Sequence, residues 1–370
     1  MTTRADSAIP ILLMARELGP GGTERQLTEL ARHLDRVRFD ARVGCFQNGV
    51  RSADLEAAGI PVQRFPVASF LSANGVRGAW QLGSYMRRHK IQILHTFDAP
   101  LNVFGVPVGR AFGVPRIIAS QRGHRSLLPK VRKMLRLTDR LSDAIVVNCE
   151  YLREHLRTEE GVRAEKIRLC YNGLDTTVFH PDRQSGKPFT IGVTCVLRPE
   201  KGLATLLRAF ARVRPLRPTM QLTIVGSGEM LPDLQRLAAS LDISGHILFE
   251  PSTSDVRPWL NGMDVFVMPS LSEALSNSLM EAMACGCVAV ASNVGGNPEL
   301  IRHGETGLLF ERENVEDLAA QLRILIENPE RMGRLAAAGT RRIAMDFSVE
   351  ASARRMEEIY SEVLGVPTSK

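Results

Sequence analysis

Short apolar runs typical of buried β-strands alternate with helical patterns along the whole chain, and they do so in two successive sets. This alternation predicts βαβ units, in which parallel strands form a sheet that helices cover on both faces. A chain of 370 residues is also long enough to bury two cores. We therefore expect two doubly wound α/β domains. The first set comprises residues 9–15, 41–47, 91–97, 116–121, 144–149 and 167–172, and the second comprises 189–196, 220–226, 246–250, 264–270, 287–292 and 307–310.

A segment rich in Gly, Pro, Asp and Ser, residues 172–188, separates the two sets and is typical of a linker. We place the first domain at residues 1–180 and the second at 181–348. Residues 347–364 repeat apolar side chains at helical spacing behind Ser348, a candidate N-cap, and predict one amphipathic helix. Ligands of such sheets bind outside the carboxyl ends of the strands, so two facing domains would place their binding edges across one cleft.

The composition excludes several classes of protein. Apolar residues make up 44% and charged residues 24%, as in globular proteins, and the apolar run 9–14 is too short for a signal peptide or a membrane span. The six cysteines include no CxxC pair and no histidine at metal-ligand spacing, which indicates reduced, buried thiols. We therefore expect a cytoplasmic protein.

The positive charge is concentrated in the first half of the chain, with a net charge of +10 over residues 1–180 and −3 over residues 181–370. A basic half can face nucleic acid, an anionic membrane or phosphorylated substrates. Aromatic residues make up only 5% of the chain, and it contains no recognisable nucleic-acid-binding motif. We expect no nucleic-acid partner.

The stretch EALSNSLMEAMACGC, residues 273–287, places two glutamates around a small polar loop. Glu273 lies in the turn after a predicted strand, whereas Glu281 lies inside the following helix, which Ser276 or Asn277 can cap and Gly286 can end. The backbone N–H groups of the first turn would form an anion site for a diphosphate. A carboxylate on each flank could accept the paired hydroxyls of ribose and hexose. Two solvated glutamates on a surface helix are the alternative. The residues of this expected site are Glu273, Ser276, Asn277, Ser278, Leu279 and Glu281.

This stretch, followed by ASNVGGNPELI (291–301) and GETGLLF (304–310), resembles the E-x7-E region of family 4 retaining glycosyltransferases. Four further stretches resemble other motifs of that family in the same order: residues 19–34, 171–181, 197–210 and 224–230. The resemblance implies the GT-B fold, in which two Rossmann-like domains face each other across a cleft. It further implies that residues 1–180 bind the acceptor, that residues 181–348 bind the nucleotide sugar, and that a C-terminal helix within 349–370 crosses back to the first domain.

The resemblance also implies roles for single residues. Glu281 would bind the ribose of the donor, Glu273 would lie by the donor sugar, and the loop amides between them would hold sugar and phosphate. Lys201, in LRPEKG, would neutralise the departing diphosphate. An arginine usually stands five residues before this lysine, but that position is Val196 here. Arg198 would therefore supply the second cation, or the site has only one.

The loop GPGGTERQ, residues 19–26, predicts a close approach of backbone to ligand at Gly21 and Gly22. Thr23 and Gln26 have the spacing of a capping box at the start of a helix. A dinucleotide-binding fingerprint would need a third glycine at position 24, which is a glutamate, so a dehydrogenase is disfavoured. The resemblance places this glycine loop near the donor phosphates, and a plain tight turn is the alternative.

Many members of the family carry a histidine in the cleft after the strand that corresponds to residues 116–121. Arg122 stands at that position here, with His124 two residues later, and both are candidates for the acceptor side. The assignment of a general base stays open between them. Retaining enzymes of this fold are thought to let the leaving phosphate assist the acceptor proton, so a side-chain base is not required.

Residues 125–143 are basic and helical in period, with Leu127, Val131, Met134, Leu135 and Leu141 on one side and cations on the other. Such a helix either packs against the core with a solvated face or docks on an anionic membrane, as relatives with lipid-linked acceptors do. Peripheral attachment to the inner face of the membrane is therefore an open alternative to a purely cytoplasmic location.

These features predict a retaining hexosyltransferase that moves a sugar from a nucleotide diphosphate sugar to a hydroxyl of a small-molecule, glycan or lipid-linked acceptor, in polysaccharide, glycolipid or glycoconjugate synthesis. The chain contains no Asp-x-Asp motif, so we expect neither a metal ion nor another cofactor. The alternatives are a sugar-nucleotide epimerase of the same architecture and a non-catalytic nucleotide- or nucleic-acid-binding module.

Overall fold

The computed structural model describes residues 8–67, 69–70, 72–123, 129–182 and 186–367. The chain forms two compact units. The first unit contains Met1–Gly173 and Val349–Lys370, and the second contains Leu174–Ser348.

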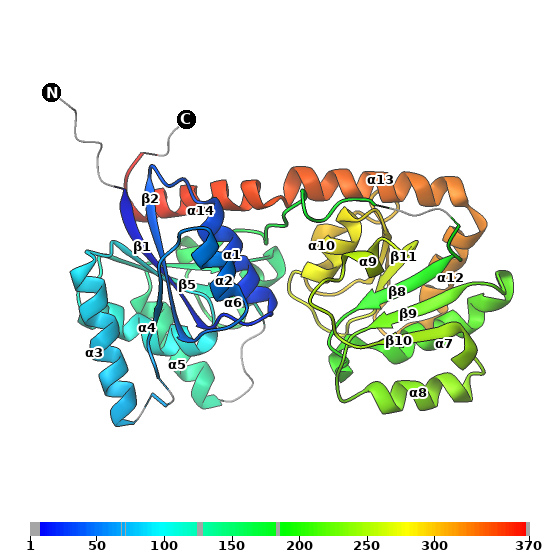
Figure 1. Cartoon of the computed structure of the whole chain (residues 1–370), viewed down its shortest axis with the longest axis horizontal. Helices are drawn as coiled ribbons and strands as arrows, with labels where there is room; N and C mark the ends of the chain where they lie inside the picture. The colour runs from blue at the N-terminus through cyan, green and yellow to red at the C-terminus, as the bar shows by residue number, and fades with distance from the viewer. Residues whose placement is uncertain (1–7, 68, 71, 124–128, 183–185, 368–370) are drawn as a thin grey trace. The chain divides into compact units, whose positions relative to one another are not determined.

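The first unit is built on a seven-stranded parallel sheet with the strand order β3-β2-β1-β4-β5-β6-β7 (Figure 1). Six of these strands coincide with the predicted runs of the first set. The strand β3 was not predicted, because it has only three residues, none of them fully buried. The strands are β1 (Ile9–Glu17), β2 (Phe39–Gln47), β3 (Val62–Arg64), β4 (Ile93–Thr96), β5 (Arg116–Gln121), β6 (Ala144–Val147) and β7 (Ile167–Leu169).

Helices cover both faces of this sheet. Alternate residues of β1 enter different core clusters, with Ile11 and Leu13 in one and Leu12 and Met14 in the other. A strand buried on both faces explains why the first set reads as continuous apolar runs. The helices are α1 (Gly22–His33), α2 (Arg51–Ala57), α3 (Ala73–Arg88), α4 (Ala99–Ala111), α5 (Pro129–Leu141), α6 (Glu150–Thr158) and α14 (Val349–Leu364).

The C-terminal helix α14 belongs to the first unit, as the resemblance implied. Met356, Ile359 and Tyr360 are buried in the same core cluster as β1 and β2, and the ring of Tyr360 packs edge-on against Phe39 at 5.8 Å. The hydroxyl of Tyr360 also lies 2.8 Å from Nδ1 of His95 in β4. A stretch that lies at the end of the chain therefore completes the core of the first unit.

The second unit has a six-stranded parallel sheet with the order β10-β9-β8-β11-β12-β13, in which every strand matches a predicted run. The strands are β8 (Thr190–Thr194), β9 (Gln221–Val225), β10 (Ile247–Glu250), β11 (Val265–Met268), β12 (Val288–Ser292) and β13 (Leu308–Phe310). The helices are α7 (Leu203–Val213), α8 (Leu231–Ser240), α9 (Arg257–Leu260), α10 (Asn277–Ala284), α11 (Asn297–Leu300), α12 (Val315–Glu327) and α13 (Pro329–Asp346).

The second unit begins earlier in the chain than expected. The amide of Leu174 donates to the carbonyl oxygen of Phe347 at 2.9 Å, and Leu174 forms an isolated parallel bridge with Ser348. These contacts join Leu174 to the second unit, whose first residue it is, so the expected boundary after residue 180 lies too late.

Candidate functional site

Each sheet has one point at which the strand order reverses. In the first unit this switch point lies between β1 and β4, and in the second it lies between β8 and β11. Loops that follow the strands on either side of a switch point diverge to opposite faces of the sheet and leave a crevice, where ligands of such folds bind. In the second unit, the loops after β8 and β11 carry Lys201 and Glu273.

Lys201 and Glu273 form an ion pair at this edge of the second unit. The Nζ of Lys201 lies 2.7 Å from Oε2 of Glu273, and both side chains are partly buried. The hydroxyl of Ser270 donates to the same carboxylate oxygen at 3.2 Å. The structure therefore brings together two of the predicted site residues, which lie far apart in the sequence.

Two glycines allow the loop that carries Glu273 to lie so close to its neighbours. Gly202 and Gly295 have φ angles of 62° and 54°, a region that favours glycine. A Cβ atom at Gly202 would overlap the carbonyl oxygen of Pro269, and one at Gly295 would overlap the carbonyl oxygen of Glu273. The position of Glu273 thus depends on side-chain-free backbone on both flanks.

Helix α10 begins as predicted, with Ser276 rather than Asn277 as the N-cap. Its hydroxyl accepts the amide of Leu279 at 3.3 Å, so that amide is not open to a ligand, contrary to our expectation. Asn277 and Ser278, in the same first turn, are partly exposed. Glu281 lies inside the helix and is 4% exposed. The helix ends before Gly286, whose φ of 82° fits the predicted role at the end of the helix.

The expected second cation does not join the ion pair. Arg198 is exposed, and its guanidinium lies 3.9 Å from the carboxylate of Glu200. Val196, at the position where the resemblance led us to expect arginine, is 48% exposed. Among the described contacts, Lys201 is the cation that lies against Glu273.

In the first unit, the predicted capping box at Thr23 and Gln26 is wrong. Helix α1 starts at Gly22 with Gly21 as its N-cap, and no side chain caps it. Gln26 instead forms two hydrogen bonds of 2.8 Å with the backbone of Gly173, because this buried peptide group needs both a donor and an acceptor.

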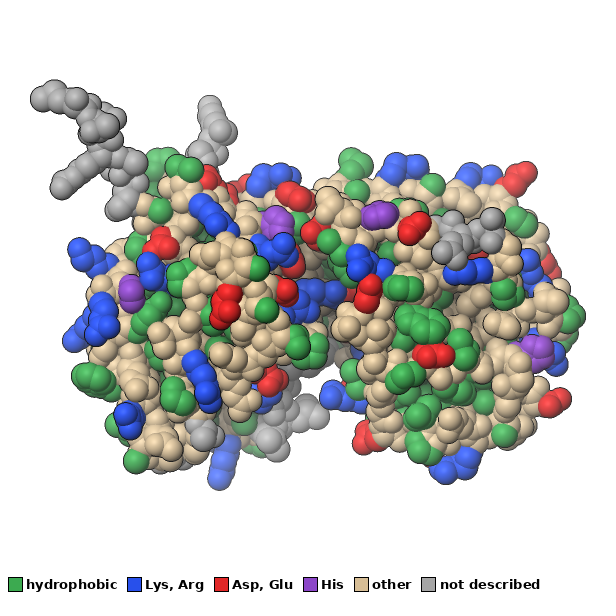
Figure 2. Space-filling model, viewed as in Figure 1, with side chains coloured by type: hydrophobic (Ala, Val, Ile, Leu, Met, Phe, Trp, Pro, Cys, Tyr) green, Lys and Arg blue, Asp and Glu red, His purple; other side chains and the backbone are tan. Residues whose placement is uncertain are grey.

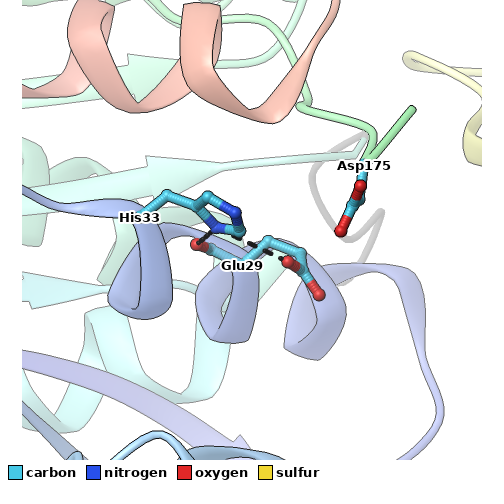
Figure 3. Close-up of side chains that lie close together, drawn as sticks. All are labelled: Glu29, His33 and Asp175. Carbon is cyan, nitrogen blue, oxygen red and sulfur yellow. Dashed lines mark hydrogen bonds and ion pairs between the residues drawn. The ribbon is translucent and has the colours of Figure 1, made fainter. Parts of the chain in front are cut away.

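Further along α1, Glu29 and His33 lie one helical turn apart, as Figure 3 shows. The Nδ1 of His33 is 2.9 Å from the carbonyl oxygen of Glu29 and 3.6 Å from its carboxylate. Within its described residues, the first unit adds no third His, Cys, Asp or Glu to this pair. We therefore assign the pair to the stability of α1.

Arg122 follows β5 at the carboxyl edge of the first sheet and is partly buried. Its guanidinium donates to Oδ1 of Asn172 at 2.5 Å and lies 5.6 Å from the ring centre of Phe97. Removal from water lowers the pKa of Arg122 to about 10. The second acceptor-side candidate, His124, lies outside the described residues.

Asn148 and Asn172 were not predicted as site residues. Both are buried, and Nδ2 of Asn148 donates to Oδ1 of Asn172 at 3.3 Å. The signal was present in the sequence, because both are polar residues directly after apolar runs, at the positions where parallel strands present ligand-binding groups.

A buried histidine lies behind Arg122. His95 bridges the hydroxyls of Tyr360 and Ser120, each at 2.8 Å, and its ring packs against Phe97. Burial, and secondarily the charge of Arg122, lower the pKa of His95 to about 3, so the ring is neutral. Its hydrogen bonds attach α14 to the strands that carry Arg122.

Helix α5 exposes more apolar surface than predicted. Leu135 is buried, but Met134 and Leu137 are 46% and 55% exposed. Arg132 and Arg136 both pair with the buried carboxylate of Glu160, at 2.6 and 3.0 Å. Leu127 lies outside the described residues. Arg132 and Arg136, which belong to the predicted cationic side of this helix, therefore form ion pairs within the first unit instead of facing solvent alone.

The surface offers no broad region of one charge on the face drawn in Figure 2, where basic and acidic side chains are intermixed over each unit. None of the described helices is long and apolar enough to cross a bilayer.

Models of two protein families match the chain. Residues 176–342 match glycosyl transferases group 1, and residues 20–178 match glycosyltransferase family 4. Known structures share the fold over nearly the whole chain. Anabaena Alr3699/HepE, solved in complex with UDP, is 22% identical with a TM-score of 0.81 over 96% of this chain and 100% of its own. Sucrose-phosphate synthase from Thermosynechococcus elongatus is 19% identical with a TM-score of 0.82 over 96% of this chain and 99% of its own.

Curated relatives agree with these matches. A GDP-mannose-dependent alpha-(1-6)-phosphatidylinositol monomannoside mannosyltransferase of Mycolicibacterium smegmatis is 29% identical, over 95% of this chain and 98% of its own length. A D-inositol 3-phosphate glycosyltransferase of Rhodococcus erythropolis is 35% identical, over 59% of this chain and 53% of its own length. The two parallel-sheet units have the GT-B fold. The chain belongs to glycosyltransferase family 4, which disfavours both the epimerase and the non-catalytic module.

Proposed function

We propose that this glycosyltransferase moves a hexose from a nucleotide diphosphate sugar to a hydroxyl of a glycolipid acceptor, with retention at the anomeric carbon and without a metal ion or other cofactor. The observation that carries the proposal is the pairing of Lys201 with Glu273 at the switch point of the second sheet. One relative's name gives GDP-mannose as the donor and phosphatidylinositol monomannoside as the acceptor, which supports a glycolipid acceptor. A second relative is named for D-inositol 3-phosphate, which shares the inositol phosphate group without the lipid.

In this proposal the donor diphosphate competes with Glu273 for Lys201. A diphosphate carries more charge than one carboxylate, and the positive end of α10 lies at the same loop. The ammonium group would shift toward the phosphates and free the Glu273 carboxylate for the hydroxyls of the donor sugar. Glu281, buried in the same helix, would accept the ribose hydroxyls.

The transfer breaks the bond between the anomeric carbon and the diphosphate oxygen, and the electron pair stays on the diphosphate. Lys201 stabilises this charge as it develops. The acceptor oxygen then bonds to the anomeric carbon from the face that the diphosphate leaves, and its proton passes to a diphosphate oxygen. This route needs no side-chain base, and Lys201 takes the place of a divalent ion.

We also propose that α5 contributes to docking on an anionic membrane. Met134 and Leu137 are exposed on it, and Lys130, Lys133 and Arg140 are exposed beside them. Apolar side chains together with cations bind the interface of anionic bilayers. Co-sedimentation with anionic liposomes at low salt tests this, since a protein that stays in the supernatant would contradict it.

The transfer itself is tested by incubating the full chain with GDP-mannose, UDP-glucose and ADP-glucose, each with and without a phosphatidylinositol extract. We expect one donor to release free nucleotide slowly alone and faster with the extract, and we expect the product to keep the anomeric configuration of the donor by proton NMR. Interconversion of the donor sugar, or an inverted product, would overturn the proposal.

A further inference from the structure

Arg122 lies at a convergence of four strand ends in the first unit. Phe97, Arg122, Asn148 and Asn172 follow the neighbouring strands β4, β5, β6 and β7 respectively, directly or within three residues. All four are joined by contacts, because Arg122 touches Phe97 and Asn172, and Asn172 touches Asn148. The carboxyl edge of a parallel sheet is where α/β folds bind their ligands.

Within the part of the chain that the structure describes, the charge of Arg122 has no counter-ion. Among the described residues, no carboxylate lies within ion-pair distance of its guanidinium, and its one hydrogen-bond acceptor is the neutral amide oxygen of Asn172. By contrast, Arg132 and Arg136 share the buried carboxylate of Glu160. A partly buried guanidinium without a counter-ion costs stability, and a guanidinium offers five N–H donors in a fixed fork that matches carboxylates and phosphates.

The neighbouring amide adds an acceptor to this cation. The Oδ1 of Asn148 is buried and, among the described residues, has no hydrogen-bond partner. A buried acceptor without a partner is costly, and a hydroxyl of a ligand can satisfy it. The cluster can thus bind one anionic group through Arg122 and one hydroxyl through Asn148, a pair of features found in phosphorylated or carboxylated polyols and sugars.

We propose that Arg122 binds an anionic group, a phosphate or a carboxylate, of the acceptor and thereby selects acceptors that carry one. The inference rests on the proposed transfer to a hydroxyl acceptor and specifies its chemistry. Asn172 acts as a positioning residue, because its neutral oxygen orients the guanidinium without cancelling its charge.

The test uses Asn172→Asp, which keeps the shape and the acceptor oxygen but gives Arg122 an internal counter-ion. Arginine side chains of the full chain are labelled with nitrogen-15, and the Nε–Hε signal of Arg122 is identified by its absence in Arg122→Lys. Inorganic phosphate is added against sodium chloride of equal ionic strength. We expect a saturable shift of this signal in the wild type and at least a tenfold weaker response in Asn172→Asp.

The control is Asn328→Asp, which makes the same charge change at an exposed site of the second unit and should bind phosphate like the wild type. A melting temperature of Asn172→Asp at or above that of the wild type excludes unfolding as the cause. Arg122 unresponsive to phosphate, or equally responsive in Asn172→Asp, would overturn the inference.

A second set of titrations tests whether the anionic group that Arg122 binds belongs to the acceptor or to the donor. D-inositol 3-phosphate is compared with free inositol, and UDP-glucuronate with UDP-glucose. We expect Arg122 to respond to the inositol phosphate and not to free inositol. A response to UDP-glucuronate but not to UDP-glucose would place the anion on the donor sugar and overturn the acceptor assignment. The donor-release assay is independent of this signal, so the transfer itself can stand if the inference fails.

Discussion

The two sheets present opposite electrostatic conditions at their carboxyl edges. In the second unit the cation Lys201 is already paired with Glu273 at 2.7 Å, whereas in the first unit the contacts of Arg122 with other described residues are to a neutral amide and an aromatic ring. In the proposed function, the ligand of the second edge breaks an internal ion pair, whereas the ligand of the first edge meets a charge that has no counter-ion among the described residues.

This difference fits different tasks. If the donor diphosphate competes with Glu273 for Lys201, as proposed above, the ion pair would favour a diphosphate over weaker anions and would keep the lysine in place between turnovers. Arg122 can bind a singly charged group, since no carboxylate of the described residues competes for it. Two units of the same type of fold thus differ in their cations. Lys201 is paired with a carboxylate, whereas Arg122 is not paired with any carboxylate of the described residues.

Removal of the paired cation, Lys201, is the strongest test of this difference between the two units. Lys201→Met should lower kcat/KM for the donor by about 10²–10³-fold, as loss of a preorganised group that stabilises developing charge does in other enzymes. The remaining Glu273 carboxylate would also repel the diphosphate. Steady-state kinetics with the preferred sugar nucleotide measure this, with Arg323→Met, an exposed change on α12, as control. Near-normal kinetics for Lys201→Met would show that the pair is not part of the donor site.

The second prediction concerns the backbone that holds this pair. Gly295→Ala places a Cβ on the carbonyl oxygen of Glu273 at a φ of 54°, and we expect a loss on the order of 3 kcal/mol in the free energy of unfolding, with weaker donor binding. Gly304→Ala is the matched control, because Gly304 has a φ of 79° but open space around it. Urea denaturation of both variants separates the two causes of instability, because Gly304→Ala has the backbone strain without the overlap of atoms. Equal losses of unfolding free energy in the two variants would show that the close contact with Glu273 does not matter.

The third prediction concerns His95, which lies behind Arg122 in the first unit, and the pH dependence of the protein's stability. The pKa of His95 is about 3 in the folded state and about 6.5 in an unfolded chain, so the unfolded state binds an extra proton between these values. His95 therefore contributes stability above pH 6.5 that is lost as the pH falls, by about 2 kcal/mol between pH 7 and pH 5. His95→Gln should remove this part of the pH dependence, whereas the exposed His180→Gln should leave it unchanged. Urea denaturation at pH 7 and pH 5 measures this. If the free energy of unfolding changes equally with pH in the wild type and in His95→Gln, the low pKa of folded His95 is not the cause.

The smallest expected effect is that of a chelator. If Lys201 alone offsets the charge of the diphosphate, EDTA should change the turnover by less than about twofold, since no bound divalent ion contributes to the barrier. Assays with and without EDTA, followed by addition of magnesium, measure this. A loss of activity that magnesium restores would mean that the second edge uses an ion in addition to its lysine.

The strands of both sheets were largely predictable, because strands buried on both faces read as continuous apolar runs. The strand β3 was not predicted, since its three residues are partly or fully exposed and form no apolar run. The cap of α10 at Ser276 was also predictable, because capping depends on neighbouring residues in the sequence.

Long-range contacts were not predictable. Thr23 and Gln26 have the spacing of a capping box, yet Gln26 bonds to Gly173, which is distant in the sequence. The convergence of Arg122, Asn148 and Asn172 depends on the order of β5, β6 and β7, which spacing along the chain does not reveal. The resemblance to a family supplied separate roles for Lys201 and Glu273, but their ion pair needed the structure. Asn148 and Asn172 follow apolar runs in the sequence, but their contacts with each other and with Arg122 needed the structure.

The return of α14 to the first unit affects how the protein is made. Residues 174–348 are contiguous and hold all strands of their own sheet, so this half can fold as soon as it leaves the ribosome. The N-terminal half is synthesised earlier but lacks Met356, Ile359 and Tyr360 of its core until the last stretch emerges. The half that is translated first is therefore completed last, and a premature stop near residue 350 would leave it exposed to aggregation and proteases.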